Sequence, residues 1–318
     1  MVFPETKHRI ANRLHFDADK ARDQLKQGLL ADSARVDPKY FYDDLGCTLY
    51  AAICRLDEYY LTRIEQAIFQ ENRIEITTEI GQGGTFVDLG AGDCAKGRCW
   101  LPFLKPARYL AVDIAGPLLD TTLTDMATEF PSVDMIGLIT DFSSRLELPD
   151  TLLQGPVTLF YPGSSIGNFA PADALRLLGE IQSYASNGLL IGVDAKKDKA
   201  ILEAAYADKL GVTAAFNRNV LRHINRLIDA GFDEAKWQHI SRYEVEAGRV
   251  EMYLEACEEQ SIALDGVTRW FKQGERIHSE NSYKYHRAEF AALLRQAGFA
   301  DVRCWSDAED FFWVFFAR

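Results

Sequence analysis

Hydrophobic residues recur at the spacing of an α-helix through most of the first eighty residues. The stretch Ala18–Leu30 is rich in Ala, Lys, Gln and Leu, all good helix formers. A second helical pattern starts at Pro38, and a third runs from about Asp57 to Ile74. The glycine-rich turn at 81–84 then ends the region, so we expect a helical N-terminal segment.

From Thr85 the pattern changes to short apolar runs separated by amphipathic stretches. The apolar runs predict strands at 86–89, 109–113, 134–139, 157–161 and 188–194. The stretches between them predict helices near 95–103, 117–130 and 171–185. Strands that alternate with helices in this way are typical of a parallel sheet with helices on both faces. Such a sheet binds its ligand beyond the carboxyl ends of its strands.

The alternation breaks after residue 200. Two helical segments, 200–209 and 214–230, precede stretches 239–246 and 249–255, which predict antiparallel strands. A last helix (288–297) and strands near 302–305 and 311–316 can close the same sheet. We therefore expect an α/β fold with a doubly wound, Rossmann-like sheet, and a second domain built from the N-terminal helices and an α+β insertion.

Composition and charge favour a globular protein that acts on a small molecule. The chain has 318 residues, of which 47% are hydrophobic and 12% aromatic, enough for a large core. Lys and Arg number 35 against 47 Asp and Glu, for a net charge of −12. This balance argues against a nucleic-acid-binding face and against polybasic attachment to a membrane. We expect a monomer with a small-molecule substrate.

The cysteines and the first residues indicate a compartment. The six cysteines include no CxxC pair and read as small hydrophobic residues in a reducing environment. Charged residues, not an apolar run, follow Met1, so no signal peptide is expected, and the apolar stretches are too short to span a bilayer. From the cysteines and the first residues we expect a cytoplasmic protein. The histidines show no pairing pattern, so we expect no metal site.

The most informative short motif runs from Asp88 to Gly92, where a predicted strand turns into a helix. A Gly-x-Gly turn alone also fits an ordinary strand–helix connection, and the third glycine of a dinucleotide fingerprint is missing. Asp113 ends the second strand, where an acidic residue can bind ribose hydroxyls, and Asp141-Phe142 follows the third. These strand ends resemble those of class I S-adenosylmethionine-dependent methyltransferases, whose cationic cofactor needs no phosphate site.

Five longer segments sharpen this resemblance. They are YDDLG (42–46), RLDEYYLTR (55–63), PGSSIGN (162–168), GVTAAFNRN (211–219) and ENSYKY (280–285). Together they resemble the histidine Nα-methyltransferases of ergothioneine biosynthesis, which make hercynine. The resemblance extends from about Tyr40 to the C-terminus.

The resemblance implies two domains and a set of site residues. A methyltransferase domain would span 62–196 and 286–318, and a substrate-binding domain 8–61 and 197–285. S-adenosylmethionine would be held by Tyr42, Gly90, Lys96, Asp113, Asp141 and Phe142. The amino-acid end of the substrate would be held by Tyr59, Asn168 and Tyr206, its imidazole by Glu280 and Ser282, and the pocket would be lined by Gly163, Thr213 and Met252. Catalysis would rest on Tyr42, Tyr59 and Asn168, which orient the amine.

Each assignment has a structural alternative. Tyr59 and Tyr206 could be core tyrosines, and Met252 could simply pack in the core. Asn168 could cap the helix predicted from residue 171. Lys96 could be an exposed helix residue, and Glu280 and Lys284, four residues apart, could form a solvated pair.

The sequence also departs from the family pattern. Leu61 stands where a proline often follows the tyrosine pair, Tyr50 where we associate phenylalanine, and Asn281 where an apolar residue is frequent. These departures leave the reaction type intact but keep open a related imidazole substrate, such as a 5-thiohistidine methylated on the ring as in ovothiol-type pathways. A non-catalytic module that binds S-adenosylmethionine is the other alternative.

Overall fold

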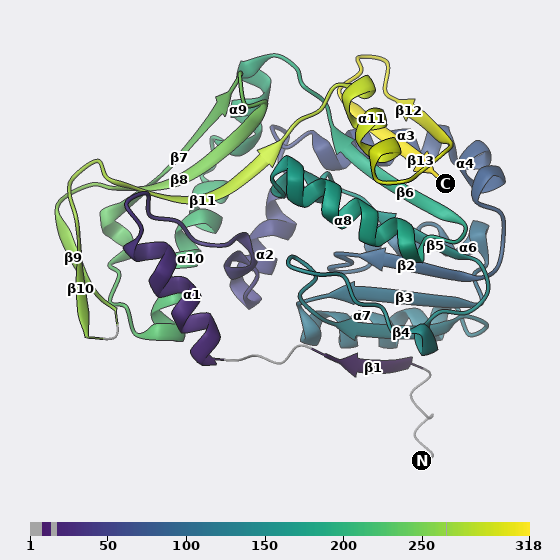
Figure 1. Ribbon diagram of the computed structural model, residues 1–318, viewed down its shortest axis with the longest axis horizontal. Helices are drawn as coiled ribbons and strands as arrows, with labels where there is room; N and C mark the ends of the chain where they lie inside the picture. Colours follow the sequence, from purple (N-terminus) through teal and green to yellow (C-terminus); the bar gives the residue numbers. More distant parts are fainter. Residues whose placement is uncertain (1–7, 14–17, 265) are drawn as a thin grey trace. The chain divides into compact units, whose positions relative to one another are not determined.

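Two compact units make up the structure, a computed structural model that describes residues 8–13, 18–264 and 266–318. The first unit contains 8–13 with Arg63–Lys196 and Tyr285–Arg318. The second unit contains 18–62 with Lys197–Lys284. Each unit is therefore assembled from segments that are far apart in the sequence (Figure 1).

The first unit is built on an eight-stranded sheet with the order β1-β4-β3-β2-β5-β6-β13-β12. The strands are β1 (His8–Asn12), β2 (Thr85–Leu89), β3 (Arg108–Asp113), β4 (Asp134–Ile139), β5 (Val157–Tyr161), β6 (Gly188–Asp194), β12 (Val302–Ser306) and β13 (Phe312–Ala317). The first six strands run parallel, whereas β13 is antiparallel to both β6 and β12. The strand order reverses between β2 and β5, which marks the edge where such sheets bind ligands. The predicted α/β class is confirmed.

Burial explains why most of these strands could be predicted. Every residue of β2, β5, β6 and β13 is buried, as the near-continuous apolar runs of central strands require. Strand β1 differs from the expectation, because it pairs with β4 although it lies in the segment 8–61 expected to be helical and part of the substrate-binding domain. This edge strand is only half-buried and has few apolar residues, so its sequence gives no strand signal.

Helices cover both faces of this sheet. They are α3 (Leu61–Glu71), α4 (Arg73–Ile80), α5 (Ala95–Arg98), α6 (Leu101–Leu104), α7 (Gly116–Glu129), α8 (Pro171–Tyr184) and α11 (Arg287–Gln296). Helices α8 and α11 lie side by side on one face, and α7 lies on the other (Figure 1). The helix expected over 95–103 is two short helices instead, because Pro102 lacks the N–H needed to continue a helix.

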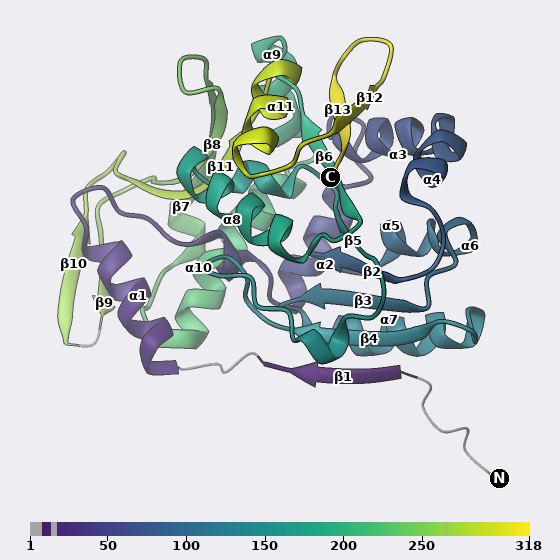
Figure 2. The same cartoon turned by 45° about the vertical axis from the view of Figure 1, so that its right-hand side comes forward.

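The second unit combines helices with a small antiparallel sheet (Figure 2). Its helices are α1 (Ala18–Leu30), the 3-10 turn η1 (Pro38–Phe41), α2 (Asp44–Ile53), α9 (Lys199–Tyr206) and α10 (Val212–Ile228). The sheet has the order β11-β8-β7, formed by β11 (Arg276–Tyr283), β8 (Arg249–Ala256) and β7 (Trp237–Glu244). A separate hairpin pairs β9 (Gln260–Leu264) with β10 (Val267–Phe271). Only β7 and β8 were expected from the sequence.

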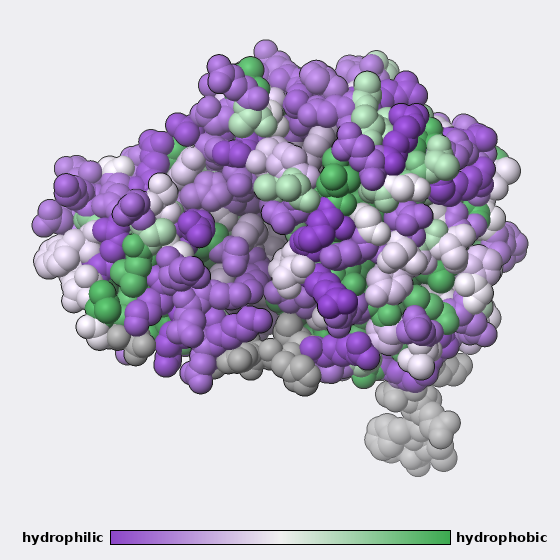
Figure 3. Space-filling model, in the orientation of Figure 1, coloured by the Kyte–Doolittle hydropathy of each residue, from purple (hydrophilic) through white to green (hydrophobic). Residues whose placement is uncertain are grey.

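The surface is mainly hydrophilic on the face that can be seen. On the face shown in Figure 3, hydrophilic residues cover most of the surface and hydrophobic residues are scattered among them. Isolated exposed apolar side chains such as Ile74 and Trp270 are normal for globular proteins. Within the ranges 8–13, 18–264 and 266–318, no helix combines the length and the apolar character that crossing a bilayer demands.

Candidate active site

The turn after β2 leaves open space at the carboxyl edge of the first unit's sheet. Gly90 has a φ of +66°, which favours glycine, and its N–H donates to the carbonyl of Val112 at 2.9 Å. A Cβ atom at Gly90 would lie 4.0 Å from the ring of Tyr161, and one at Gly92 would meet nothing within 4 Å in the described part of the chain. The backbone at this turn is therefore open to a ligand.

The carboxylate of Asp113 is fixed between two neighbouring turns. Its Oδ2 accepts the N–H of Gly92 at 2.8 Å, and its Oδ1 accepts the N–H of Ala115 at 2.8 Å. Each carboxylate oxygen can accept a further hydrogen bond. Asp113 thus holds the glycine turn in place and can still bind a hydroxyl-bearing ligand.

The next strand, β4, carries the expected polar–aromatic pair just after its end. Asp141 Oδ1 accepts hydrogen bonds from Ser143, from the N–H at 2.9 Å and from the hydroxyl at 2.5 Å. The ring of Phe142 contacts the ring of Tyr161 edge-on, with centroids 6.0 Å apart. The structure therefore brings Gly90, Asp113 and the Asp141-Phe142 pair to the ends of three adjacent strands, as expected.

Lys96 is held by a carboxylate that the sequence analysis missed. Its Nζ lies 2.5 Å from Oε2 of Glu65, a residue of α3 that is only 1% exposed. Glu65 Oε1 also accepts the N–H of Gly163 at 2.7 Å. A Cβ at Gly192 would collide with this carboxylate, so glycine is required there. Lys96 is thus a positioned cation and not a solvated helix residue.

Gly163 and Asn168 lie in the loop after β5, in the same unit as the glycine turn. Gly163 has a φ of +78°, and Ser164 follows in the left-handed conformation with its hydroxyl accepting the N–H of Asp194 at 2.9 Å. Asn168 ends the turn η3 (Ser165–Asn168). The N-cap of α8 is Ala170 and has no side-chain hydrogen bond, so the alternative that Asn168 caps this helix is wrong.

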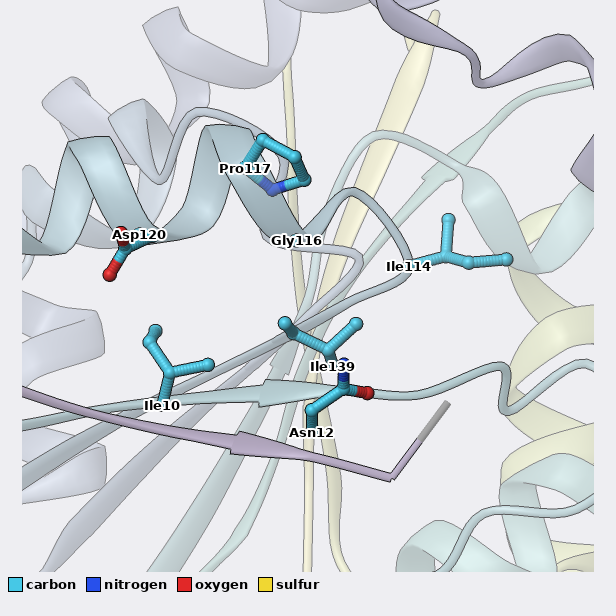
Figure 4. Close-up of a pocket in the computed structure, with 7 residues that line it drawn as sticks. All are labelled: Ile10, Asn12, Ile114, Gly116, Pro117, Asp120 and Ile139. Atoms are coloured by element: carbon cyan, nitrogen blue, oxygen red, sulfur yellow. The ribbon is translucent and has the colours of Figure 1, made fainter. Parts of the chain in front are cut away.

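A pocket of about 490 Å³ lies beside this edge of the sheet (Figure 4). It is bounded by the end of β1, the end of β4 and the first turn of α7; its lining is Ile10, Asn12, Ile114, Gly116, Pro117, Asp120 and Ile139. Ile114 directly follows Asp113, and Ile139 precedes Asp141 by two residues. None of the expected site residues lines this pocket, which is a neighbour of the candidate cofactor site.

In the second unit, Glu280 and Ser282 lie on one face of β11. Glu280 is opposite Met252 of β8, and Ser282 is opposite Val250, so these side chains share the face packed against α9 and α10. Glu280 is 8% exposed, and burial raises the pKa of its carboxyl to about 7, an effect that the nearby Lys284 ammonium partly offsets. Lys284 is also buried, so the alternative of a solvated Glu280–Lys284 pair is wrong.

Three tyrosines assigned to the site belong to this unit. Tyr59 and Tyr206 are buried and meet edge-on, with ring centroids 6.2 Å apart. Burial is also the main cause that raises the pKa of Tyr59 well above its usual value, so its hydroxyl stays protonated. Tyr42 contacts the rings of Tyr50 and Phe216, with centroids 5.9 and 6.1 Å away.

Thr213 and Met252 are both buried in this unit. The N–H of Thr213 donates to Asp208 Oδ1 at 2.7 Å, and Asp208 also accepts the N–H of Val212 at 2.9 Å. Although burial acts in the opposite direction, the hydrogen bonds from Thr213 and from the start of α10 lower the pKa of Asp208. Asp208 therefore stays ionised and fixes the first turn of α10, where Thr213 lies.

Comparison with known proteins finds relatives along almost the whole chain. A family model described as histidine-specific methyltransferase, SAM-dependent, matches residues 21–318. The chain is 34% identical to a histidine N-alpha-methyltransferase of Mycolicibacterium smegmatis and 36% identical to one of Mycobacterium tuberculosis; each alignment covers 95% of this chain and 97% of the relative. It is 28% identical to a 4-dimethylallyltryptophan N-methyltransferase of Trichophyton verrucosum, over 89% of this chain and 88% of that one. The resemblance inferred from the sequence is confirmed.

Proposed function

Because the chain belongs to the S-adenosylmethionine-dependent, histidine-specific methyltransferases, we propose that it methylates the α-amine of L-histidine. Three successive transfers would yield hercynine, a step of ergothioneine biosynthesis. The observation that carries the choice of substrate is the buried pair of Glu280 and Ser282 on one face of β11. An imidazole ring can hydrogen-bond to both side chains, whereas a ligand without such groups would leave a buried carboxylate unpaired.

The first unit has the features that S-adenosylmethionine requires. The open glycine turn lets the cofactor approach the protein backbone closely, Asp113 suits its ribose hydroxyls, and Asp141-Phe142 suits its adenine. When bound, the cofactor supplies a methyl group activated by a sulfonium. We assign its binding to Tyr42, Gly90, Lys96, Asp113, Asp141 and Phe142.

The remaining residues would hold the amino acid and orient its nitrogen. We propose that Tyr59, Asn168 and Tyr206 bind its amino and carboxylate end, and that Tyr42, Tyr59 and Asn168 direct the amine lone pair. Gly163, Thr213 and Met252 would line the pocket. Before each transfer the ammonium nitrogen would release one proton to solvent. The neutral amine would then form a nitrogen–carbon bond while the sulfur–carbon bond breaks. Orientation and desolvation supply most of the rate, since the methyl donor needs no further activation.

The proposal requires one chain and fits a reducing compartment. We propose that the protein acts as a monomer. All six cysteines are free thiols, as expected in the cytoplasm.

The reaction can be tested directly by incubating the protein with L-histidine and S-adenosylmethionine. We expect histidine to gain the mass of one to three methyl groups, and NMR of the product to place them on the α-nitrogen. Methyl groups on the ring would favour the related imidazole chemistry. A protein that binds both compounds but adds no methyl group to histidine would contradict the proposal.

Glu65→Gln is expected to weaken cofactor binding about tenfold, because Lys96 loses a charged partner. The Gly163 N–H keeps an acceptor in the amide oxygen, so the loop after β5 should persist. Calorimetric titration with S-adenosylhomocysteine measures the affinity, and Glu71→Gln, an exposed residue on the same helix, is the matched control.

A double-mutant cycle with Lys96→Met separates positioning from general destabilisation. If Glu65 acts through Lys96, the double variant should bind no more weakly than Lys96→Met alone. Additive losses would show that Glu65 does not act through Lys96.

A further inference from the structure

Three buried polar groups of the second unit form a closed triangle. Lys284 Nζ donates to the hydroxyl oxygens of Tyr206 and Ser282, each at 2.9 Å, and the Tyr206 hydroxyl donates to Ser282 Oγ at 2.8 Å. Lys284 is 1% exposed, Ser282 4% and Tyr206 6%. At this depth the direction of each hydrogen bond matters, because water cannot replace a missing partner.

The hydrogens in this triangle can be assigned from chemistry. An ammonium group only donates, so both hydroxyl oxygens must accept from Lys284. Between the two hydroxyls, the phenol of Tyr206 is the more acidic and hence the better donor. Ser282 Oγ then accepts two hydrogen bonds, which use both of its lone pairs. Its own proton is left to be donated to another group.

We propose that Lys284 is a positioning residue that fixes Ser282 as a hydrogen-bond donor, so that the pocket selects the neutral imidazole ring. This inference rests on the proposed function of the Glu280–Ser282 pair. Glu280, on the same face and two residues away, is the acceptor of the pair. A neutral imidazole has one N–H donor and one nitrogen acceptor, which match this pair, whereas an imidazolium has two donors. The buried positive charge of Lys284 also disfavours a cationic ring.

The side-chain spacing supports a ring between the two residues. Two residues along a strand are separated by about 7 Å, with both side chains on the same face. Glu280 and Ser282 are paired opposite Met252 and Val250 without interruption, since the irregularity of β11 lies earlier, between His278 and Glu280. A five-membered ring with a hydrogen bond at each nitrogen can span that separation.

The experiment compares the affinity of L-histidine with that of its two pyrrole analogues, pyrrol-2-yl-alanine and pyrrol-3-yl-alanine. Each analogue keeps one ring N–H and lacks the nitrogen lone pair. Titration in the presence of S-adenosylhomocysteine measures binding without turnover. We expect the unaltered protein to prefer histidine over both analogues by about tenfold or more, because Ser282 finds no acceptor on a pyrrole.

Variants assign that preference to the triangle. Ser282→Ala and Lys284→Met should each reduce the preference for histidine severalfold, and the double variant should reduce it no further than Ser282→Ala alone. S-adenosylhomocysteine affinity and the melting temperature report whether a variant is folded. Val245→Thr, an exposed position in the same unit, is the control.

Two results would overturn the inference. One is an unaltered protein that binds a pyrrole analogue as tightly as histidine, a measurement that does not depend on any variant folding. The other is a Lys284→Met protein that binds histidine and the analogues more weakly by the same factor. If the protein bound histidine with this preference but did not methylate it, the result would contradict the proposed function and leave the inference standing.

Discussion

Replacing Asp113 by alanine is expected to lower the affinity for S-adenosylmethionine by at least about a hundredfold. The variant loses the acceptor of two backbone N–H groups, those of Gly92 and Ala115, together with the proposed ribose contact. Hydrogen bonds to charged groups contribute about 1.5–3 kcal/mol each, and 1.4 kcal/mol corresponds to a factor of ten. Because the variant loses both the hydrogen bonds that hold the glycine turn and the ligand contact, this loss of affinity is one of the largest expected effects.

Calorimetric titration with S-adenosylhomocysteine measures the loss. The affinity of Asp113→Asn should lie between those of the unaltered protein and Asp113→Ala. Its amide oxygen can accept a hydrogen bond from one N–H, while its NH₂ group faces the other N–H. Asp125→Asn, an exposed position on the adjacent helix α7, should bind normally. If the affinity of Asp113→Ala for S-adenosylhomocysteine were within about threefold of that of the unaltered protein, Asp113 would not be part of the cofactor site.

Replacing Glu280 by glutamine is expected to lower kcat/KM for L-histidine about a hundredfold. The amide has nearly the same size but lacks the charge, so the ring N–H loses its strongest acceptor. Affinity for S-adenosylhomocysteine should be unchanged, because Glu280 is assigned to the substrate alone. Glu280→Ala should lose histidine affinity in the same way while cofactor binding persists.

The matched control is Glu255→Gln, in the same sheet but on its opposite face, where Glu255 accepts from Arg276. If Glu280→Gln weakened histidine and cofactor binding equally, Glu280 would have a structural role. Steady-state kinetics with each ligand varied in turn would distinguish the two cases.

The same variant should change how stability depends on pH. Burial raises the pKa of Glu280 to about 7 in the folded protein, above its ordinary value of 4.5. Its contribution to stability is therefore fully present below pH 4.5 and is lost as the pH rises towards 7. Glutamine does not titrate, so the free energy of unfolding of Glu280→Gln should exceed that of the unaltered protein by an amount that grows over this window, to about 3 kcal/mol at most. Asp88, whose pKa burial also raises to about 7, is common to both proteins and cancels.

Much of the fold could be predicted because the central strands are apolar along their whole length. The strands from β2 to β6, and the late pair β12 and β13, were all expected within a few residues. The strands that were missed have other signatures. Strand β1 is half-exposed, and β11 carries polar residues at buried positions. Polar residues at buried positions, such as Glu280, mask the apolar alternation by which a strand is predicted.

Motif resemblance assigned residues to ligands but gave no indication of the residues that support them. The segment GVTAAFNRN was identified as a marker, but two of its residues are structural. Asn219 donates to Asp43 at 2.7 Å, and Asn217 donates to His239 Nδ1 at 2.8 Å. Glu65 and Lys284 were not assigned at all. Glu65 contacts residues that are 31 and 98 positions away in the sequence, and Lys284 contacts Tyr206, which is 78 positions away. No local sequence pattern could therefore indicate these contacts.

The eight-stranded sheet is completed only by the last residues of the sequence, which has a consequence for how the chain folds during synthesis. Strand β6 ends at Asp194, but the strand that pairs with its free edge, β13, begins only at Phe312. Until those last residues emerge from the ribosome, a strand that is fully buried in the folded protein has an unpaired edge while Lys197–Lys284 of the second unit is being made. An edge of that kind readily pairs with another chain. We therefore expect nascent chains of this protein to be prone to pairing with other chains until β13 is synthesised.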